Sequence, residues 1–196
     1  MREAPTTLDI AESFNSVQCE GNTTGYPAYF VRLKACNLMC GGTNGSLMDS
    51  GEATWWCDTE AVWRRGIETP FYRLIQKWES EDVYDWISQG RIHIIWTGGE
   101  PSIPKHQRAI FAFHNYMKEK LEQQGEEMNT FDEIETNGTL YLQDDLFDML
   151  DQVNCSVKLA NSGMPKRRRI VPKALERIME HNLSLIHISE PTRRYS

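Results

Sequence analysis

The chain has 196 residues, of which 40% are hydrophobic and 25% are charged, and its formal net charge at pH 7 is −7. This composition is typical of one globular domain with a substantial core. The acidic excess argues against a broad surface for nucleic-acid phosphates, and no apolar run is long enough to cross a membrane, so we expect neither kind of partner.

Strand-like and helix-like segments alternate along the chain. Strands are predicted where short runs are rich in β-branched and aromatic residues, and helices where apolar residues recur at helical spacing. In chain order we expect a strand at 28–33, a helix at 70–90 that is broken near Ser80, a strand at 93–96, a helix at 104–125, a strand at 130–135, a helix at 144–152, a strand at 156–160 and a helix at 172–181. This order predicts an α/β fold with a parallel sheet, either open and doubly wound or an arc of a barrel.

Residues with useful chemistry fall at one end of the predicted strands. Cys36 and Cys40 follow the first strand, residues 97–101 (Thr-Gly-Gly-Glu-Pro) follow the second, residues 136–138 (Thr-Asn-Gly) follow the third, and Lys158 lies in the fourth. Ligands of parallel α/β sheets bind at the carboxyl ends of the strands. These four segments are therefore expected to converge on one site, where the glutamate of the second supplies an anion for an ammonium group.

The five cysteines, at positions 19, 36, 40, 57 and 155, are odd in number. The N-terminus lacks the cationic and apolar segments of a secretion leader, so we expect reduced thiols and a cytoplasmic protein. Cys36, Cys40 and Cys57 are interpreted as ligands of a four-iron cluster, in which three thiolates would leave one iron free for another ligand. A structural zinc site is the alternative, although the nearest histidine, His93, lies within a predicted strand.

Six segments resemble motifs of the radical S-adenosylmethionine (SAM) superfamily, and more closely those of its 7-carboxy-7-deazaguanine synthase family. They occur in the family's order and cover the chain from about Ser13 to Gly163. The segments are residues 14–21, 30–38, 56–59, 97–101, 135–139 and 156–158. A single Gly-Gly-Glu-Pro would be a weak signal, whereas six ordered matches are a strong one.

The resemblance implies a role for each matched position, none of them catalytic in its own right. Cys36, Cys40 and Cys57 would hold a [4Fe-4S] cluster, and Thr59 would offer its hydroxyl to Mg²⁺, which accepts few protein ligands when substrate oxygens complete its octahedron. The residues around SAM would be Trp56, Asp58, Gly99, Glu100, Glu135, Asn137, Ser156 and Lys158. The residues facing the substrate would be Val17, Gln18, Cys19, Arg32 and Thr97. The planar fork of Arg32 suits both oxygens of a carboxylate.

The implied reaction is a ring contraction with loss of ammonia. With an electron from a flavodoxin- or ferredoxin-type reductant, SAM would yield a radical that converts 6-carboxy-5,6,7,8-tetrahydropterin to 7-carboxy-7-deazaguanine, on the way to queuosine-type tRNA or modified DNA. A homodimer is compatible with this interpretation. Another radical SAM enzyme, such as an activase that installs a protein radical, is the alternative, and it gives no reason for Arg32, Gln18 and Thr59 together.

The sequence departs from the family pattern at three places. Sixteen residues, 41–56, separate Cys40 from Cys57 where the common superfamily motif has two, and their Gly/Ser/Asn-rich start is expected to loop out so that Cys57 remains the third ligand. Cys19 stands where the family has a glycine, and Val157 where it has a proline.

Three features outside these motifs complete the expectations. Residues 183–196 resemble the translation of a sequencing adaptor, so we expect them to be foreign. Residues 1–182 would then form the radical SAM domain, a partial (β/α) barrel that is incomplete at its C-terminus and has an unpaired edge. The one dense basic cluster, residues 166–169, is interpreted as a solvated loop face, and Cys155 as a small buried apolar residue.

Overall fold

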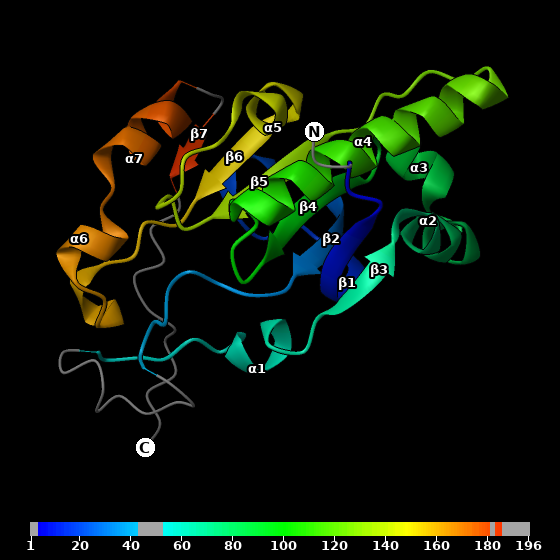
Figure 1. The fold of residues 1–196 in the computed structure, drawn as a ribbon. Coiled ribbons are helices and arrows are strands. Elements are labelled where there is room, and N and C mark those ends of the chain that lie inside the picture. Colours follow the sequence, from blue (N-terminus) through cyan, green and yellow to red (C-terminus); the bar gives the residue numbers. More distant parts are fainter. Residues whose placement is uncertain (1–3, 43–52, 181–182, 186–196) are drawn as a thin grey trace.

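The computed structural model describes residues 4–42, 53–180 and 183–185. In these residues one sheet of seven strands has the order β3-β1-β2-β4-β5-β6-β7 (Figure 1). The strands are β1 (Thr7–Val17), β2 (Pro27–Leu33), β3 (Ile67–Pro70), β4 (His93–Gly98), β5 (Asp132–Thr136), β6 (Gln152–Cys155) and β7 (Leu183–Leu185). The helices are α1 (Glu60–Trp63), α2 (Phe71–Ser80), α3 (Tyr84–Ser88), α4 (Pro104–Gln124), α5 (Asp144–Met149), α6 (Lys166–Arg169) and α7 (Pro172–Met179), with short 3-10 turns η1 (Gly21–Thr23) and η4 (Ala160–Ser162).

The sheet is mostly parallel. Strands β2, β4, β5, β6 and β7 run in the same direction, and only β1 pairs antiparallel, with β2 on one side and β3 on the other. Within the described residues β3 and β7 are the two edges, so the sheet does not close. The expected α/β fold, an arc of a (β/α) barrel, is therefore confirmed.

The two faces of the sheet have different chemistry. Val31 and Leu33 of β2 belong to the large apolar core that the helices cover, whereas Phe30 packs with Ile95 in a small separate cluster on the other face. Because side chains alternate between faces along a strand, Arg32 shares the face of Phe30. The uncovered face therefore collects the polar side chains from which the site is built.

Helix α4 shows why the helical patterns were predictable. Its stripe of Ile110, Phe113, Met117 and Leu121 is buried against the sheet, at the spacing that defines one face of a helix. The helix ends at Gly125, whose φ of 77° is the left-handed conformation that closes many helices. The predicted break near Ser80 is also confirmed, since α2 ends there and α3 begins at Tyr84.

Some predicted elements were wrong. Residues 156–160 are not a strand, because the fourth crossover strand is β6 at Gln152–Cys155, and the predicted helix at 144–152 ends at Met149. The strand was not recognised in the sequence because Gln152 and Asn154 are polar, although both are buried in the structure. Lys158 consequently lies in the loop after the strand rather than within it.

Other elements were missed by sequence reasoning. The long strand β1 was not predicted, although its buried Leu8 and Ile10 have the spacing of a half-buried strand. The basic residues 166–169 form the short helix α6 and not a loop. None of the described helices combines the length and the apolar character needed to cross a membrane.

Candidate active site

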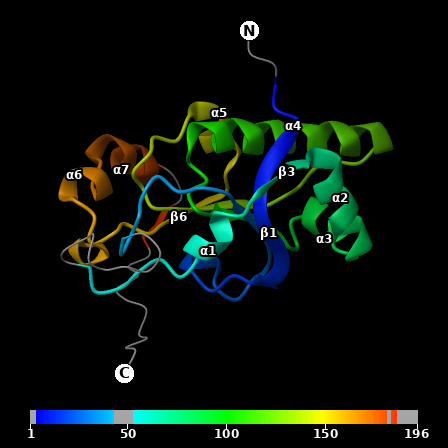
Figure 2. The same ribbon diagram turned by 60° about the horizontal axis from the view of Figure 1, so that its bottom comes forward.

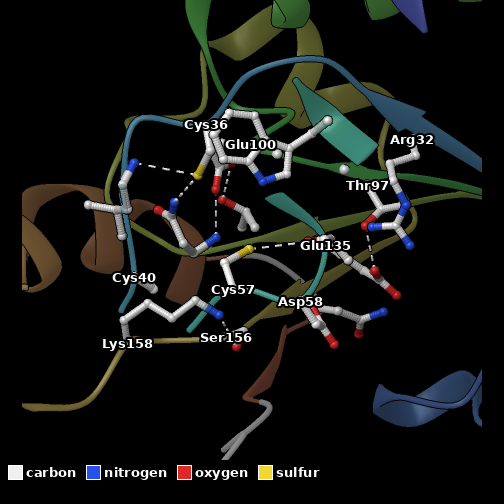
Figure 3. Close-up of a pocket in the computed structure, with 18 of the residues that line it drawn as sticks. Arg32, Cys36, Cys40, Cys57, Asp58, Thr97, Glu100, Glu135, Ser156 and Lys158 are labelled. Atoms are coloured by element: carbon white, nitrogen blue, oxygen red, sulfur yellow. Dashed lines mark hydrogen bonds between the residues drawn. The ribbon is translucent and has the colours of Figure 1, made fainter. Parts of the chain in front are cut away.

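A cavity of about 440 Å³ opens at the carboxyl ends of β2, β4, β5 and β6 (Figure 3). The segments that follow these strands meet there, as expected from the sequence, and residues 55–59 close another side. The predicted site residues that line the cavity are Arg32, Cys36, Cys40, Trp56, Cys57, Asp58, Thr59, Thr97, Gly99, Glu100, Glu135, Asn137, Ser156 and Lys158. The lining residues to which no site role had been given are Glu20, Leu38, Trp55, Trp63, Gly98, Thr136 and Asn154.

The three cysteines reach the cavity from two segments. Cys36 and Cys40 lie in the loop after β2, and Cys57 precedes α1. The backbone N–H of Cys57 donates to the carbonyl of Cys40 over 3.1 Å, so the chain returns to the first pair despite the sixteen intervening residues. Gly41 makes this return possible, because its φ is 80° and a Cβ there would lie 2.2 Å from Cα of Trp56. Residues 43–52 of the insert lie outside the described residues.

Cys36 and Cys40 occupy an environment that favours the neutral form of their thiols until a cation binds. Burial, followed by the charge of Glu100 and the neighbouring thiols, raises the pKa of Cys36 to about 12. Burial likewise raises the pKa of Cys40 to about 11, although Lys158 opposes the shift. A coordinated metal deprotonates its thiol ligands outright, so iron binding would overcome these shifts.

The three thiols line one cavity and can serve as the ligands of a cluster. In the described part of the chain, no three Cys, His, Asp or Glu side chains converge as ligands of one metal ion. A four-iron cluster binds each thiolate at a different iron, so its ligands need not meet at one point. Thiol donors are also the ligands that iron–sulfur clusters prefer, and the residues present therefore fit such a group.

Glu100 joins two of the converging loops. Its buried carboxylate accepts hydrogen bonds from the backbone N–H of Ser102 (2.9 Å), the hydroxyls of Ser102 (2.5 Å) and Thr136 (2.7 Å), and the backbone N–H of Asn137 (2.8 Å). These donors fill roughly the four acceptor positions of a carboxylate. The side chain therefore positions the loops after β4 and β5, and its predicted contact with an ammonium group stays a prediction.

Arg32, Thr97 and Glu135 lie side by side on the uncovered face of the sheet (Figure 3). The hydroxyl of Thr97 donates to Glu135 over 2.7 Å, and burial raises the pKa of the Glu135 carboxyl. Nε of Arg32 donates to Glu12 over 2.8 Å. The bonds described for Arg32 thus engage one edge of the guanidinium and leave its terminal amino groups for a ligand in the cavity.

The other predicted substrate residues do not line the cavity. Val17 and Cys19 are exposed, whereas Gln18 is buried and its amide donates to Glu133 (3.2 Å) and Glu135 (3.3 Å). Gln18 therefore reaches the site through the carboxylate of Glu135 rather than through the cavity wall.

Glu133 is a buried carboxylate that sequence reasoning missed. Besides Gln18, it accepts hydrogen bonds from Thr23 (2.8 Å) and Asn154 (2.9 Å), and it lies 2.6 Å from Nδ1 of His93. Its hydrogen bonds hold the segment between β1 and β2 against the sheet. Glu133 lies two positions before Glu135 on the same strand. The strand alternation that places Glu135 on this face also places Glu133 there, and could have revealed it.

Gly99 allows the loops after β2 and β4 to touch. A Cβ at this position would lie 1.8 Å from the carbonyl oxygen of Ala35, next to Cys36. We expect Gly99→Ala to lower the free energy of unfolding by about 3 kcal/mol, because backbone has to move, and to reduce iron incorporation. Chemical denaturation and iron analysis after reconstitution measure the two effects.

Gly125→Ala provides the matched control for this change. Gly125 has a positive φ, 77°, which Gly99 does not share, and nothing lies within 4 Å of its Cβ position. We expect it to cost only about 1 kcal/mol and to leave iron incorporation unchanged. Equal effects of the two substitutions would contradict the close approach of the loops at Gly99.

The chain is similar in sequence to several curated proteins of one name. No family model matches the chain. It is 32% identical over 156 residues to the 7-carboxy-7-deazaguanine synthase of Methanospirillum hungatei, covering 80% of this chain and 52% of that protein. It is 29% identical over 160 residues to the enzyme of the same name from Aquifex aeolicus, covering 81% of this chain and 58% of that protein. The chain thus spans about half the length of the curated relatives it matches.

A solved structure is similar only loosely. The crystal structure of QueE from Escherichia coli matches with a TM-score of 0.49 and 17% identity, covering 92% of this chain and 94% of that one. The relationship therefore rests on sequence. The chain is an α/β protein with a cysteine-containing cavity at the carboxyl ends of its parallel strands. By sequence it is a relative of the 7-carboxy-7-deazaguanine synthases, which confirms the resemblance that its six motifs indicated.

Proposed function

We propose that the chain carries the cluster and SAM site of a 7-carboxy-7-deazaguanine synthase, a radical SAM lyase. The observation that carries the proposal is the convergence of Cys36, Cys40 and Cys57 on a cavity whose far wall presents Arg32. The names of the relatives give the product, 7-carboxy-7-deazaguanine, and the reaction proposed for this chain is its formation from 6-carboxy-5,6,7,8-tetrahydropterin with loss of ammonia. When bound, the cluster and SAM supply the radical chemistry.

The protein's own contribution is binding and orientation. Terminal amino groups of Arg32 hold the substrate carboxylate in a charge-assisted pair, while Thr97, positioned by its hydrogen bond to Glu135, orients the rest of the ring. Ser156 and Lys158, whose side chains are hydrogen-bonded over 3.0 Å, line the part of the cavity assigned to SAM with Trp56 and Asp58. The tryptophans around the cysteines exclude water from it.

The proposal extends to ions, partners and location. The Thr59 hydroxyl lies 3.3 Å from Sγ of Cys57, and we assign it to Mg²⁺, which substrate oxygens would help to coordinate. A flavodoxin- or ferredoxin-type protein serves as the reductant. Location in the cytoplasm, the absence of a nucleic-acid partner, and compatibility with a homodimer belong to the same proposal.

One assay tests the function. The chain is reconstituted anaerobically with iron and sulfide, and is then given SAM, dithionite, Mg²⁺ and the carboxytetrahydropterin. We expect mass spectrometry to detect 7-carboxy-7-deazaguanine. SAM cleavage without this product would favour a different radical SAM enzyme. Failure to incorporate iron, with zinc bound instead, would favour the zinc module.

We also propose that residues 1–182 form the functional domain and that residues 183–196 are foreign to it. Residues 183–185 pair with β6 as β7, in the register Val153↔Leu183, and residues 186–196 lie outside the described residues. If the segment is foreign, deleting 183–196 changes the free energy of unfolding by no more than about half a kcal/mol, as for most surface changes. Urea denaturation of the full and the shortened chain measures this difference in the free energy of unfolding. A loss of about 2 kcal/mol or more would show that β7 belongs to the native sheet.

A further inference from the structure

Helix α6 is a basic surface placed against the cysteine loop. All four of its residues, Lys166–Arg169, are cationic, and the first three are exposed. Arg168 donates from Nη2 to the carbonyl of Asn37, the residue that follows Cys36, over 2.6 Å. Two arginines of one short helix thus pack on the segments of the site, since Arg169 donates to the carbonyl of Lys158 over 3.3 Å. Figures 1 and 2 show α6 at the end of the molecule opposite α2 and α3.

Within the part of the chain that the structure describes, the charges of α6 are not paired with carboxylates. Six other lysines and arginines of the described residues form ion pairs, for example Arg32 with Glu12, Lys105 with Asp9 and Arg177 with Asp144. Among the described residues, no carboxylate lies within 4.0 Å of a side-chain nitrogen of α6, and Arg168 and Arg169 bond to backbone carbonyls instead. On a chain with a net charge of −7, this is a local positive patch beside the proposed cluster.

A simple solvated face explains the exposure of the patch but not its position. Four adjacent cations repel one another, and the repulsion is relieved if an anionic partner binds. The cluster needs an electron from outside, and the rate of electron transfer falls steeply with distance. A carrier must therefore dock on the surface nearest to the cysteines. That surface contains the basic patch, while the acidic remainder of the chain repels an acidic protein.

We propose that α6 and the adjoining cysteine loop form the docking surface for a small acidic one-electron carrier protein. This inference rests on the proposed function and deepens it by naming the surface and the charge of the partner. In the step that this surface would serve, the reduced carrier would lose one electron and a bound cluster would gain it, so that the electrons balance. No bond breaks and no proton moves until SAM is cleaved.

The physics of such contacts sets the expected behaviour. Electron-transfer complexes are small and transient, commonly below about 1,200 Å² of buried surface, and their charges act mainly on association. Salt screens exposed charges over about 8 to 10 Å at physiological ionic strength. Binding of the carrier is therefore expected to weaken steeply with salt and to depend on the cations that point outward, Lys166 and Arg167.

The experiment compares two charge-reversed variants with equal net charge. In Lys166→Glu/Arg167→Glu the patch is reversed, while Arg168 and Arg169 keep their bonds to the loops. In the control, Arg73→Glu/Lys118→Glu, two exposed cations are reversed on α2 and on the C-terminal half of α4. Calorimetry with flavodoxin measures the dissociation constant, and stopped-flow absorbance follows cluster reduction by flavodoxin hydroquinone or by dithionite.

We expect the patch variant to weaken flavodoxin binding by about tenfold or more at low salt and to slow reduction by flavodoxin in proportion, while dithionite reduces its cluster as in the parent. The control should stay within about twofold of the parent. If flavodoxin binding were weakened equally in both variants, net charge alone would explain the effect and the proposal would be wrong. Unchanged flavodoxin binding in the patch variant would also overturn it.

Two further measurements separate the possible failures. If an RNA oligonucleotide, and not flavodoxin, binds the parent chain and is lost in the patch variant, the surface serves nucleic acid and the proposal is wrong. If dithionite reduces a bound cluster but no deazaguanine product forms, the proposed function fails while the docking measurement still stands. If product forms with dithionite but flavodoxin binds the patch variant as tightly as the parent, only the docking inference fails.

Discussion

Replacing Cys57 with alanine is expected to abolish both cluster assembly and SAM cleavage, although sixteen residues separate this thiol from Cys40. The structure returns Cys57 to within a backbone hydrogen bond of Cys40 and exposes its thiol to the same cavity as Cys36. A cluster held by two thiolates has two irons without protein ligands and is readily lost. We expect Cys36→Ala and Cys40→Ala to behave in the same way. In each variant the iron content should fall from about four irons per chain in the parent to nearly none.

Iron and sulfide content after anaerobic reconstitution, together with formation of 5′-deoxyadenosine, measures this effect. Cys155→Ala is the control, because Cys155 is buried at the end of β6 and does not line the cavity. It should retain the iron and lose only about 1 kcal/mol of stability. Full iron content and SAM cleavage in Cys57→Ala would place the third ligand elsewhere in the chain.

Arg32→Ala is expected to raise the dissociation constant of the carboxytetrahydropterin by about 30-fold or more, a loss of roughly 2 kcal/mol or more. The guanidinium side chain is only 17% exposed and faces the cavity beside Glu135, so a carboxylate bound there forms a partly desolvated, charge-assisted pair. Iron content and SAM binding should stay as in the parent, because Arg32 lies on the opposite wall from the cysteines. Equilibrium binding of substrate to the reconstituted protein measures the change.

Two neighbouring changes sharpen this prediction. Arg32→Lys keeps the charge but not the planar fork, and should lose an intermediate part of the affinity. Glu12→Gln removes the partner of Arg32 while the guanidinium remains. Because the Glu12 side chain is 43% exposed, this change should alter substrate affinity by no more than a few-fold. If Arg32→Ala binds substrate as tightly as the parent, the carboxylate is held by another group.

The sequence by itself determined the local elements and the end of the sheet at which the chemistry gathers. The apolar stripe of α4, the aromatic and apolar run of β2 and the β-branched run of β4 are local patterns that identify their own secondary structure. Because crossover strands run parallel, the segments that follow them had to meet at one edge. The order of the motifs then sufficed to predict most of the residues that line the cavity.

The tertiary structure alone decided how those residues are held. Two of the four residues of strand β6 are polar, and its Asn154 is satisfied inside the sheet by a hydrogen bond to Glu133. Glu100 turned out to bond the loop after β5, and Gln18 to bond Glu133 and Glu135 rather than line the cavity. These partners lie 21 to 117 positions apart in the chain. No local periodicity encodes such pairs, because the hydrogen bonds of a buried carboxylate depend on which donors the completed fold brings within reach.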